Sequence, residues 1–324
     1  MGMGKYAFGV DVGGTTVKLG LFDGEGCVLD KWEIPTVKEN DGASILPDVA
    51  ESIRKKMEEK GIREEDLAGI GIGVPGAVNS KGMLVGGAVN IGWNPFNIPD
   101  AMSAYINVPI RATNDANAAA LGELWQGGGR GCRSMVAVTL GTGVGGGIII
   151  DGSIVTGAIG AAGEIGHIHI EDAETQECGC GNKGCLEQYA SATGIARLAR
   201  RRLREDQKPS TLREGEISAK AVFDAVNAGD EVAVEIARRF GAYLGKGLAT
   251  VANVVNPEKF VIGGGVSKAG EILFDFVKPE FRKYAFGPCQ GAGFALATLG
   301  NDAGIYGAAG LILLGGINDQ RSSH

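Results

Sequence analysis

Residues 6–22 read YAFGVDVGGTTVKLGLF, and this stretch decides which class of fold we expect. Two short apolar strands, Tyr6–Val10 and Val17–Phe22, flank a run of glycines and threonines, which predicts a tight turn between antiparallel strands. No helix follows the turn, and its spacing differs from the G-x-x-x-x-G-K-S/T pattern of a Walker loop. The backbone N–H groups of the turn and the hydroxyls of Thr15 and Thr16 are free to hold a phosphate group.

The same strand–turn–strand unit recurs at residues 135–151, which read MVAVTLGTGVGGGIIID. Predicted strands at residues 135–140 and 148–151 flank a glycine turn, Gly141–Gly147. This turn matches the pattern G-x-G-x-x-G, and so does Gly71–Gly76, but neither is followed by the helix that a dinucleotide-binding fold requires. The repeat therefore favours two similar lobes that close on a nucleotide.

Apolar periodicity places the remaining elements of a mixed α/β protein along the chain. In the first half we expect strands at residues 28–35, 67–74 and 110–114 and helices at residues 43–60 and 99–105. In the second half we expect helices at residues 116–123, 193–204, 218–226, 230–254, 269–282 and 301–314, with strands at residues 260–262 and 295–299. The polar tail 318–324 is predicted to be disordered.

The composition is typical of a soluble globular protein, except for a surplus of glycine. The 324 residues suffice for about two domains, and 44% of them are hydrophobic and 21% charged. The 55 glycines exceed the usual share, so we expect them at turns and where the backbone closely approaches a ligand.

The charge balance argues against nucleic acid as a partner. The net charge is −7 and the isoelectric point is near 5.2, whereas binding to a phosphate backbone needs a basic face. Five arginines between Arg197 and Arg204 favour a solvated helix face. Met1 leads directly into a strand, and no apolar stretch reaches the length of a membrane span. We therefore expect a cytoplasmic protein with no membrane partner.

A second distinctive stretch, residues 163–187, reads GEIGHIHIEDAETQECGCGNKGCLE. Within it, His167, Cys178, Cys180 and Cys185 form the pattern H-x10-C-x-C-x4-C, and the glycines between the cysteines let a short loop fold back on itself. Three thiolates and one imidazole make the closed tetrahedral shell that zinc prefers in structural sites, with no open position for water. The pattern predicts a structural zinc site.

The alternatives to zinc are a disulfide or free buried thiols. Cys178 and Cys180 are too close in sequence to pair without strain, which disfavours the disulfide. His169 lies two residues after His167, on the same face if the segment is extended, so the spacing does not say which imidazole binds the metal. In a reducing compartment we expect the other three cysteines to be inert buried thiols, namely Cys27, Cys132 and Cys289.

Several motifs together resemble the ROK family of sugar kinases and repressors, over nearly the whole chain. They are Asp11–Lys18, Leu140–Gly147, Glu164–His167, Cys178–Glu187 and Val261–Gly265. Within the family, the chain is most similar to bacterial glucokinases. The resemblance implies an actin-like α/β fold of two ribonuclease-H-like lobes with mixed sheets. It also implies ATP, Mg²⁺ and structural Zn²⁺ as bound groups, phosphorylation of glucose at its 6-hydroxyl, a place in glycolysis, and a homo-oligomer, dimeric or tetrameric.

The resemblance divides the chain into lobes and assigns roles to residues. The small lobe is 1–116, completed by the helix 301–317, and the large lobe is 117–300 with the zinc loop 163–187. Asp115 is the general base, and a carboxylate at a strand end suits that task, although it would equally serve as an N-cap of the next helix. The sugar-binding residues are Gly76, Asn114, Asp115, Glu164, His167 and Glu187. Those for the nucleotide and its Mg²⁺ are Asp11, Gly13, Gly14, Thr15, Thr16, Lys18, Gly141, Thr142, Gly143, Gly145, Gly264 and Gly265.

Two other functions stay open from the sequence. The repressors of the family sense a sugar and bind DNA through an N-terminal helix-turn-helix segment. Here the phosphate turn starts at Asp11, which leaves no room for that segment, and the chain is acidic. A kinase for fructose, mannose, N-acetylglucosamine or N-acetylmannosamine is the nearer alternative, because the polar residues beside the zinc pattern are shared across the family.

Overall fold

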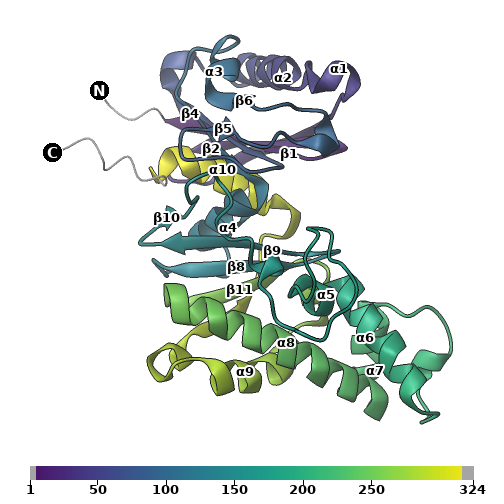
Figure 1. Cartoon of the computed structure of the whole chain (residues 1–324). Coiled ribbons are helices and arrows are strands. Elements are labelled where there is room, and N and C mark those ends of the chain that lie inside the picture. The colour runs from purple at the N-terminus through teal and green to yellow at the C-terminus, as the bar shows by residue number, and fades with distance from the viewer. Residues whose placement is uncertain (1–4, 316–324) are drawn as a thin grey trace. The chain divides into compact units, whose positions relative to one another are not determined.

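The computed structural model describes residues 5–315, which form two compact units (Figure 1). Of these residues, 5–133, 147–163 and 299–315 belong to unit 1, and 134–146 and 164–298 belong to unit 2. The tail 318–324, for which disorder was expected, lies outside the described residues.

The units divide the chain differently from the lobes expected from the sequence. The expected boundary after residue 116 falls within α4 (Asp115–Gln126), all of which belongs to unit 1. Residues 147–163 belong to unit 1 as well. The physical reason for the placement of α4 is its close packing against the C-terminal helix α10 (Ala303–Leu313).

Unit 1 is built on a five-stranded mixed sheet with the order β3-β2-β1-β4-β7. The first three strands of the chain form an antiparallel meander, and β4 and β7 run parallel to β1. The bounds are β1 Tyr6–Val12, β2 Thr16–Asp23, β3 Val28–Pro35, β4 Leu67–Val74 and β7 Ile110–Asn114, with a short hairpin of β5 Met83–Leu84 and β6 Phe96–Asn97. The strands expected at residues 28–35, 67–74 and 110–114 are confirmed.

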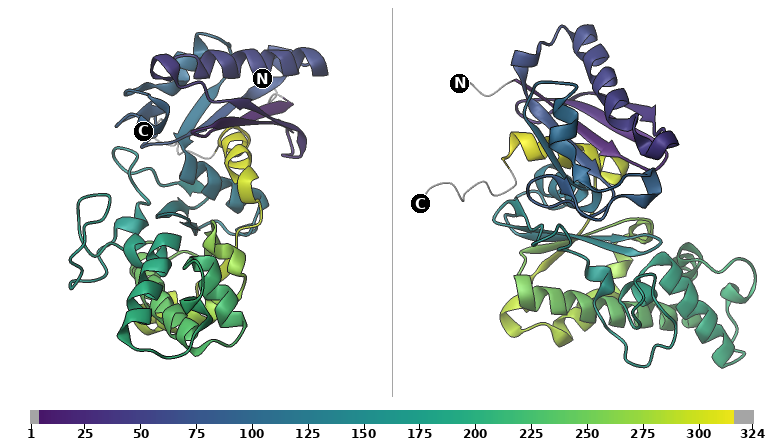
Figure 2. Two further views of the ribbon diagram at one scale, coloured as in Figure 1. Left: turned by 90° about the vertical axis from the view of Figure 1, so that its right-hand side faces the viewer. Right: turned by 45° about the horizontal axis from the view of Figure 1, so that its top comes forward.

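Helices lie on both faces of this sheet (Figures 1 and 2). On one face, Val49 and Ile53 of α2 (Ile45–Lys60) share a buried core with Phe8 and Val10 of β1. On the other face lies α10, against which α4 packs. The shorter helices of the unit are α1 (Glu39–Gly42) and α3 (Ile98–Ser103).

Glycines let α10 approach the sheet and α4 at backbone distance. A Cβ atom added to Gly71 of β4 would lie 1.7 Å from the carbonyl oxygen of Ala308, and one added to Gly307 would lie 1.6 Å from that of Ala118. Any side chain at either position would push α10 away. The glycine surplus therefore serves helix packing, in addition to the turns and ligand contacts expected from the composition.

Unit 2 combines strands of a second sheet with a group of helices. The order of that sheet is β10-β9-β8-β11-β12, and β8, β11 and β12 run parallel. The bounds of the strands are β8 Met135–Leu140, β9 Val144–Ile150, β10 Ser153–Ile154, β11 Lys259–Gly263 and β12 Gly293–Leu296. The division between the units falls within β9, whose last residues and β10 belong to unit 1.

The helices of unit 2 are arranged around the long helix α8 (Figure 1). Their bounds are α5 Glu187–Ala190, α6 Ala192–Glu205, α7 Ala219–Asn227, α8 Glu231–Val255 and α9 Ile272–Tyr284. Even α8, with 25 residues, is not apolar enough to cross a lipid bilayer, and the same holds for every helix within residues 5–315.

Several expected elements have different bounds in the structure; the strand expected at residues 295–299, for example, is β12 at Gly293–Leu296. The glycine turn after β8 is shorter than expected, because β9 already begins at Val144 and contains Gly145–Gly147. A Cβ on Gly147 would lie 2.5 Å from the Cβ of Ala120, so glycine lets this strand pass close to α4. The helix expected from residue 269 begins at Ile272, because Gly270 has a φ of 85° that ends the preceding turn.

Candidate active site and metal centre

The turn between β1 and β2 is held by the end of β3. The N–H of Gly13 donates to the carbonyl of Thr16 at 3.0 Å, and the Oγ1 of Thr36 donates to the carbonyl of Gly13 at 2.7 Å. The N–H of Thr36 also donates to the carbonyl of Thr15 at 2.9 Å. The turn expected to hold phosphate is thus fixed at two of its carbonyl groups.

A lysine and an asparagine beside this turn were missed by the sequence reasoning. A Cβ on Gly14 would lie 3.8 Å from the Nζ of Lys38 and 3.9 Å from the Nδ2 of Asn90. Both groups are hydrogen-bond donors, which suits a phosphate site. By contrast, the ammonium of Lys18 donates to the carbonyl of Asn301 at 3.0 Å. No local sequence pattern links residues 38 and 90 to the turn, since the chain folding alone brings them there.

Asp11 is a carboxylate with a strongly perturbed acidity at the end of β1. Desolvation raises its pKa to about 6, the negative charge of Asp115 adds to the increase, and Lys18 opposes it. Gly304 of α10 leaves the space for this carboxylate, because a Cβ there would lie 2.5 Å from the Oδ2 of Asp11. Two hard carboxylate oxygens that repel each other are the donor set that a divalent cation such as Mg²⁺ would stabilise.

Asn114, and not Asp115, is the N-cap of α4. The Oδ1 of Asn114 accepts hydrogen bonds from the N–H groups of Ala116 at 2.9 Å and Asn117 at 3.3 Å. Its Nδ2 donates to the carbonyl of Gly76 at 3.0 Å, which fixes the orientation of the amide group. Asn114 therefore caps α4, which was the alternative role considered for Asp115.

Asp115 lies in the first turn of α4 with its side chain accessible. Its Oδ1 accepts from the N–H of Ala116 at 2.8 Å. Desolvation by the surrounding protein raises its pKa, against the effect of hydrogen bonds from Ala116 and Asn114. A carboxylate with an elevated pKa is a stronger base, which suits the removal of a proton from a hydroxyl.

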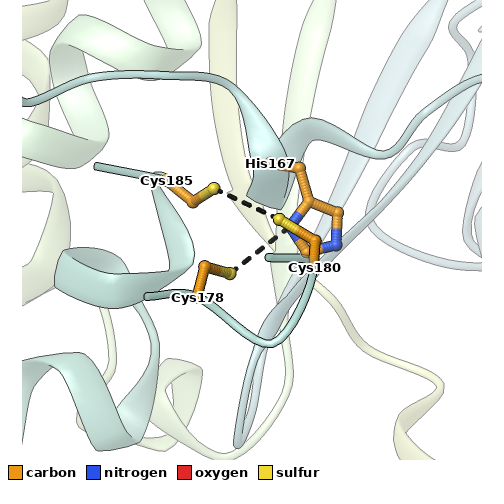
Figure 3. Close-up of side chains that lie close together, drawn as sticks. All are labelled: His167, Cys178, Cys180 and Cys185. Carbon is orange, nitrogen blue, oxygen red and sulfur yellow. Dashed lines mark hydrogen bonds between the residues drawn. The ribbon is translucent and has the colours of Figure 1, made fainter. Parts of the chain in front are cut away.

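In unit 2, His167, Cys178, Cys180 and Cys185 converge on one point (Figure 3). Their ligand atoms all lie within 4.8 Å of one another. The Sγ of Cys178 lies 3.7 Å from the Nδ1 of His167, and the sulfurs of Cys180 and Cys185 are 3.6 Å apart. In a tetrahedral zinc site, metal–sulfur distances of about 2.3 Å and metal–nitrogen distances of about 2.0 Å separate the ligand atoms by about 3.5–3.8 Å. The two shorter separations match such a site, and a small adjustment would bring the other ligand atoms, at most 4.8 Å apart, to the same spacing.

The structure separates the two histidines that the spacing left ambiguous. Residues 165–167 form a turn of 3₁₀ helix, so the segment is not extended there. His167 directs Nδ1 into the cluster, whereas the ring of His169 lies outside it. The Nδ1 of His169 is 2.9 Å from the carbonyl of Lys183 and its Nε2 is 2.8 Å from the Oδ1 of Asp172.

All six cysteines, each within residues 5–315, are free thiols, so the disulfide alternative fails. Burial raises the pKa of Cys178 to about 12, whereas a hydrogen bond from the backbone N–H of Asn182 lowers the pKa of Cys180. Outside the cluster, the expectation of buried thiols is right only for Cys289. Cys27 is exposed and Cys132 is half-buried.

Glu187 joins the cluster to the second glycine turn. Its Oε1 accepts from the Sγ of Cys178 at 2.8 Å and lies 3.8 Å from the Nδ1 of His167. A Cβ on Gly143 would lie 2.6 Å from the Oε2 of Glu187. Glu164, expected to bind the same ligand, is an exposed side chain that immediately precedes the 3₁₀ turn.

The glycine turn itself lies beside the end of β11. Gly264, with a φ of 84°, follows β11, and a Cβ on it would lie 2.5 Å from the carbonyl of Leu140. Gly265 borders open space. The structure thus brings Gly264 next to the end of β8 at Leu140, and it places Gly145 in β9.

A cavity of about 400 Å³ in unit 2 lies between the second glycine turn, the metal cluster and the start of α6. Thr142 and Gly143 line it from the glycine turn, Cys178 from the metal cluster, and Glu187 and Thr193 from the helices that follow. A ligand in this cavity would touch the turn, the cluster and α6 at once.

The expected solvated face of α6 is right for Arg200, Arg201 and Arg204, which are exposed, but Arg197 is half-buried and Arg202 is buried. Arg202 is 2% exposed and donates to Glu235 and Asp206. Arg197 and Arg201 bind the buried carboxylate of Glu174 in the loop that leads to Cys178. Desolvation opposes the ionisation of Glu174, but hydrogen bonds from Tyr189, the backbone of Gln176 and the two arginines lower its pKa to about 2. These ion pairs anchor the loop to α6.

The comparisons with known proteins agree with this geometry. A glucokinase of Halalkalibacterium halodurans is 44% identical over 313 residues, which cover 95% of this chain and 95% of that protein. A glucokinase of Thermotoga maritima is 36% identical over 310 residues, 94% of this chain and 96% of that protein.

Among solved structures, a ROK family glucokinase from Streptomyces griseus in complex with glucose and AMPPNP is similar with a TM-score of 0.70. It is 35% identical, and the match covers 94% of this chain and 98% of that chain. The expected fold class, an actin-like α/β fold with mixed sheets, is thereby confirmed. The model of the ROK family matches residues 7–314, which include the carboxylates of unit 1 and the metal cluster of unit 2, and the chain belongs to that family.

Proposed function

We propose that this protein phosphorylates glucose at the 6-hydroxyl with ATP, as a hexokinase of the glucokinase type. The observation that carries the proposal is the 44% identity to the glucokinase of H. halodurans over 95% of the chain. The S. griseus glucokinase, whose structure contains glucose and AMPPNP, supports the choice of both substrates.

In the proposed reaction, Asp115 accepts the proton of the 6-hydroxyl. The hydroxyl oxygen then forms a bond to the γ-phosphorus, and the bond from that phosphorus to the bridging oxygen of ADP breaks. The elevated pKa of Asp115 supports its role as the base. Asn114, whose amide is oriented by the carbonyl of Gly76, contacts a sugar hydroxyl in the proposal.

The nucleotide is bound, in this proposal, by the two glycine turns and by Gly264 and Gly265. Backbone N–H groups of the turns contact phosphate oxygens. Asp11 would hold Mg²⁺, which would neutralise charge on the phosphates when bound. The raised pKa of Asp11 supports this assignment, because a carboxylate that is hard to ionise gains most from a nearby cation.

Glu164, His167 and Glu187 bind sugar hydroxyls in the proposal, and zinc holds His167 and the loop that precedes Glu187. Carboxylates suit a polyol because each accepts several hydrogen bonds. The convergence of three thiols and one imidazole, a closed set of four ligands, supports a zinc ion that is structural. With Nδ1 of His167 facing the cluster, its other ring nitrogen is free for the sugar.

Four further expectations from the sequence stay predictions. They are the functional lobes 1–116 with 301–317 and 117–300, a homo-oligomeric state, a cytoplasmic location and a place in glycolysis. The preference for glucose over fructose, mannose, N-acetylglucosamine or N-acetylmannosamine rests on the curated glucokinases among the relatives.

A substrate panel tests the proposal. The purified full-length chain is assayed with MgATP and each of these five sugars, with ADP release as the measurement. For the wild-type protein we expect the highest kcat/KM with glucose. For Asp115→Asn we expect no release of ADP with any of the sugars. A higher kcat/KM for an amino sugar would contradict the choice of glucose, and release of ADP that needs no sugar would contradict the kinase.

A further inference from the structure

The residues between α5 and α6 hold the backbone of the second glycine turn. The N–H of Ala192 donates to the carbonyl of Gly141 at 2.8 Å. The Oγ1 of Thr193 donates to the carbonyl of Thr142 at 2.7 Å. Two successive carbonyl groups of the turn are therefore fixed by the first two residues of α6.

These two hydrogen bonds also decide where the N–H groups of the turn point. In a trans peptide the C=O and the following N–H point in opposite directions, and no peptide bond within residues 5–315 is cis. Because the carbonyls of Gly141 and Thr142 point at α6, the N–H groups of Thr142 and Gly143 point away from it. Successive N–H groups in a turn are the donors that bind phosphate.

A chain of hydroxyl groups supports the bond from Thr193. The Oγ atoms of Ser191 and Thr193 are 2.9 Å apart. Since a carbonyl only accepts, the single proton of the Thr193 hydroxyl goes to Thr142, and Ser191 must donate to Thr193. The Oγ of Ser191 in turn accepts from the N–H of Gly194 at 2.9 Å, and Ser191 is buried. The position of the Thr193 hydroxyl is thus set from inside α6.

The same short segment carries Glu187, the first residue of α5. The built Cβ on Gly143 falls 2.6 Å from the Oε2 of this glutamate, so the turn and the carboxylate are in direct contact. A shift of the turn at Gly143 therefore displaces the carboxylate of Glu187, and the reverse also holds. Helices α5 and α6 hold the two in place.

We propose that Thr193 is a positioning residue that couples sugar binding at Glu187 to nucleotide binding at the turn Gly141–Gly143. The inference rests on the proposed function, which takes Glu187 as a sugar ligand and the turn as a nucleotide ligand. A sugar that fixes Glu187 restricts Gly143, and Thr193 keeps the rest of the turn aligned with it. The turn Gly141–Gly143 is then already ordered when the nucleotide binds, so binding costs less conformational entropy. By thermodynamic linkage, each ligand tightens the binding of the other by the same factor.

The test compares Thr193→Val with a matched control, Thr250→Val. The Thr250 hydroxyl donates to the carbonyl of Lys246 at 3.1 Å on the exposed side of α8, so both variants lose one hydroxyl-to-carbonyl bond in unit 2. Titration calorimetry on the full-length, zinc-loaded chain measures the Kd of MgAMPPNP without glucose and with saturating glucose. The ratio of the two values is the coupling factor.

We expect Thr193→Val to lower the coupling factor about three- to tenfold, because the loss of one hydrogen bond changes an equilibrium constant by about this factor. The KM for ATP should rise in the same variant. Thr193→Ser, which keeps the hydroxyl, should restore both, and Thr250→Val should match the wild type. A Thr193→Val protein with the wild-type coupling factor overturns the inference. If the wild type binds neither ligand, the proposed function fails, and the coupling fails with it.

A second variant tests the contact from the other side. In Gly143→Ala the new methyl group displaces the carboxylate of Glu187, which is the flexible end of a side chain, so the fold survives. We expect a substitution in the nucleotide turn to weaken glucose binding at least as much as AMPPNP binding. A Gly143→Ala protein that loses affinity for AMPPNP alone would overturn the coupling.

Discussion

The Sγ of Cys178 lies 2.8 Å from the Oε1 of Glu187, so a predicted metal ligand touches a predicted sugar ligand. The metal cluster and the carboxylate proposed to bind sugar are therefore parts of one local structure. Through Gly143 this structure extends to the glycine turn, which the sequence pattern had placed outside the zinc segment.

Removal of the metal should impair sugar binding. We expect Cys180→Ser to lose zinc and to raise the Kd for glucose, because the loop that precedes Glu187 loses its anchor. Metal analysis and titration calorimetry with glucose measure the two effects. A metal-free protein that binds glucose normally would refute the link.

The two histidines give a matched pair for the same measurement. His167→Ala should contain less zinc, because its Nδ1 lies in the cluster. His169→Ala should keep its zinc, because its ring nitrogens bind Lys183 and Asp172 instead. Equal zinc contents in the two variants would contradict the assignment of His167, and not His169, as the metal ligand.

Asp115→Asn should abolish turnover and spare the fold. Loss of a general base lowers kcat by about 10²- to 10⁴-fold. The helix keeps its cap, because Asn114 accepts the hydrogen bonds at the start of α4. Steady-state kinetics measure the loss of turnover, and thermal unfolding shows whether the fold is kept. A folded variant with near-wild-type kcat would show that Asp115 is not the general base.

Asp11 should reduce the stability of the Mg²⁺-free protein at neutral pH. Its pKa rises from 3.8 to about 6 on folding, so between these values the folded state binds more protons than the unfolded state. The free energy of unfolding then falls as the pH rises through this window.

Replacement of Asp11 should therefore stabilise the protein while it impairs catalysis. We expect Asp11→Asn to increase the free energy of unfolding at pH 8 by about 1–3 kcal/mol, and the gain to vanish near pH 4. Urea unfolding without Mg²⁺ at both pH values measures it. Equal or lower stability of Asp11→Asn at pH 8 would show that the carboxylate is not under electrostatic strain.

Lys38→Met should weaken nucleotide binding and leave sugar binding unchanged. The Nζ of Lys38 borders Gly14, where it can pair with a phosphate oxygen. We expect the KM for ATP to rise about three- to tenfold, and less at high salt because the pair is screened. Lys81→Met, at another exposed lysine of unit 1, is the control. A KM for ATP that is the same in both variants would exclude Lys38.

Short-range patterns in the sequence determined the strands, the glycine turns and the set of metal ligands. Strands such as 67–74 and 110–114 were predicted with the right bounds, because apolar runs between turn residues are a local signal. The convergence of three cysteines and a histidine followed from spacing and glycine content within one segment. The family resemblance supplied the roles of the residues, which no pattern alone would give.

Only the tertiary structure decided which groups meet across long stretches of chain. It places His167 in the cluster and His169 outside it, because residues 165–167 form a helical turn. It buries Arg202 against Glu235 from another helix, and it brings Lys38 to Gly14 and Thr193 to Thr142. Such contacts depend on packing between elements far apart in sequence, and residue type and spacing do not encode that packing locally.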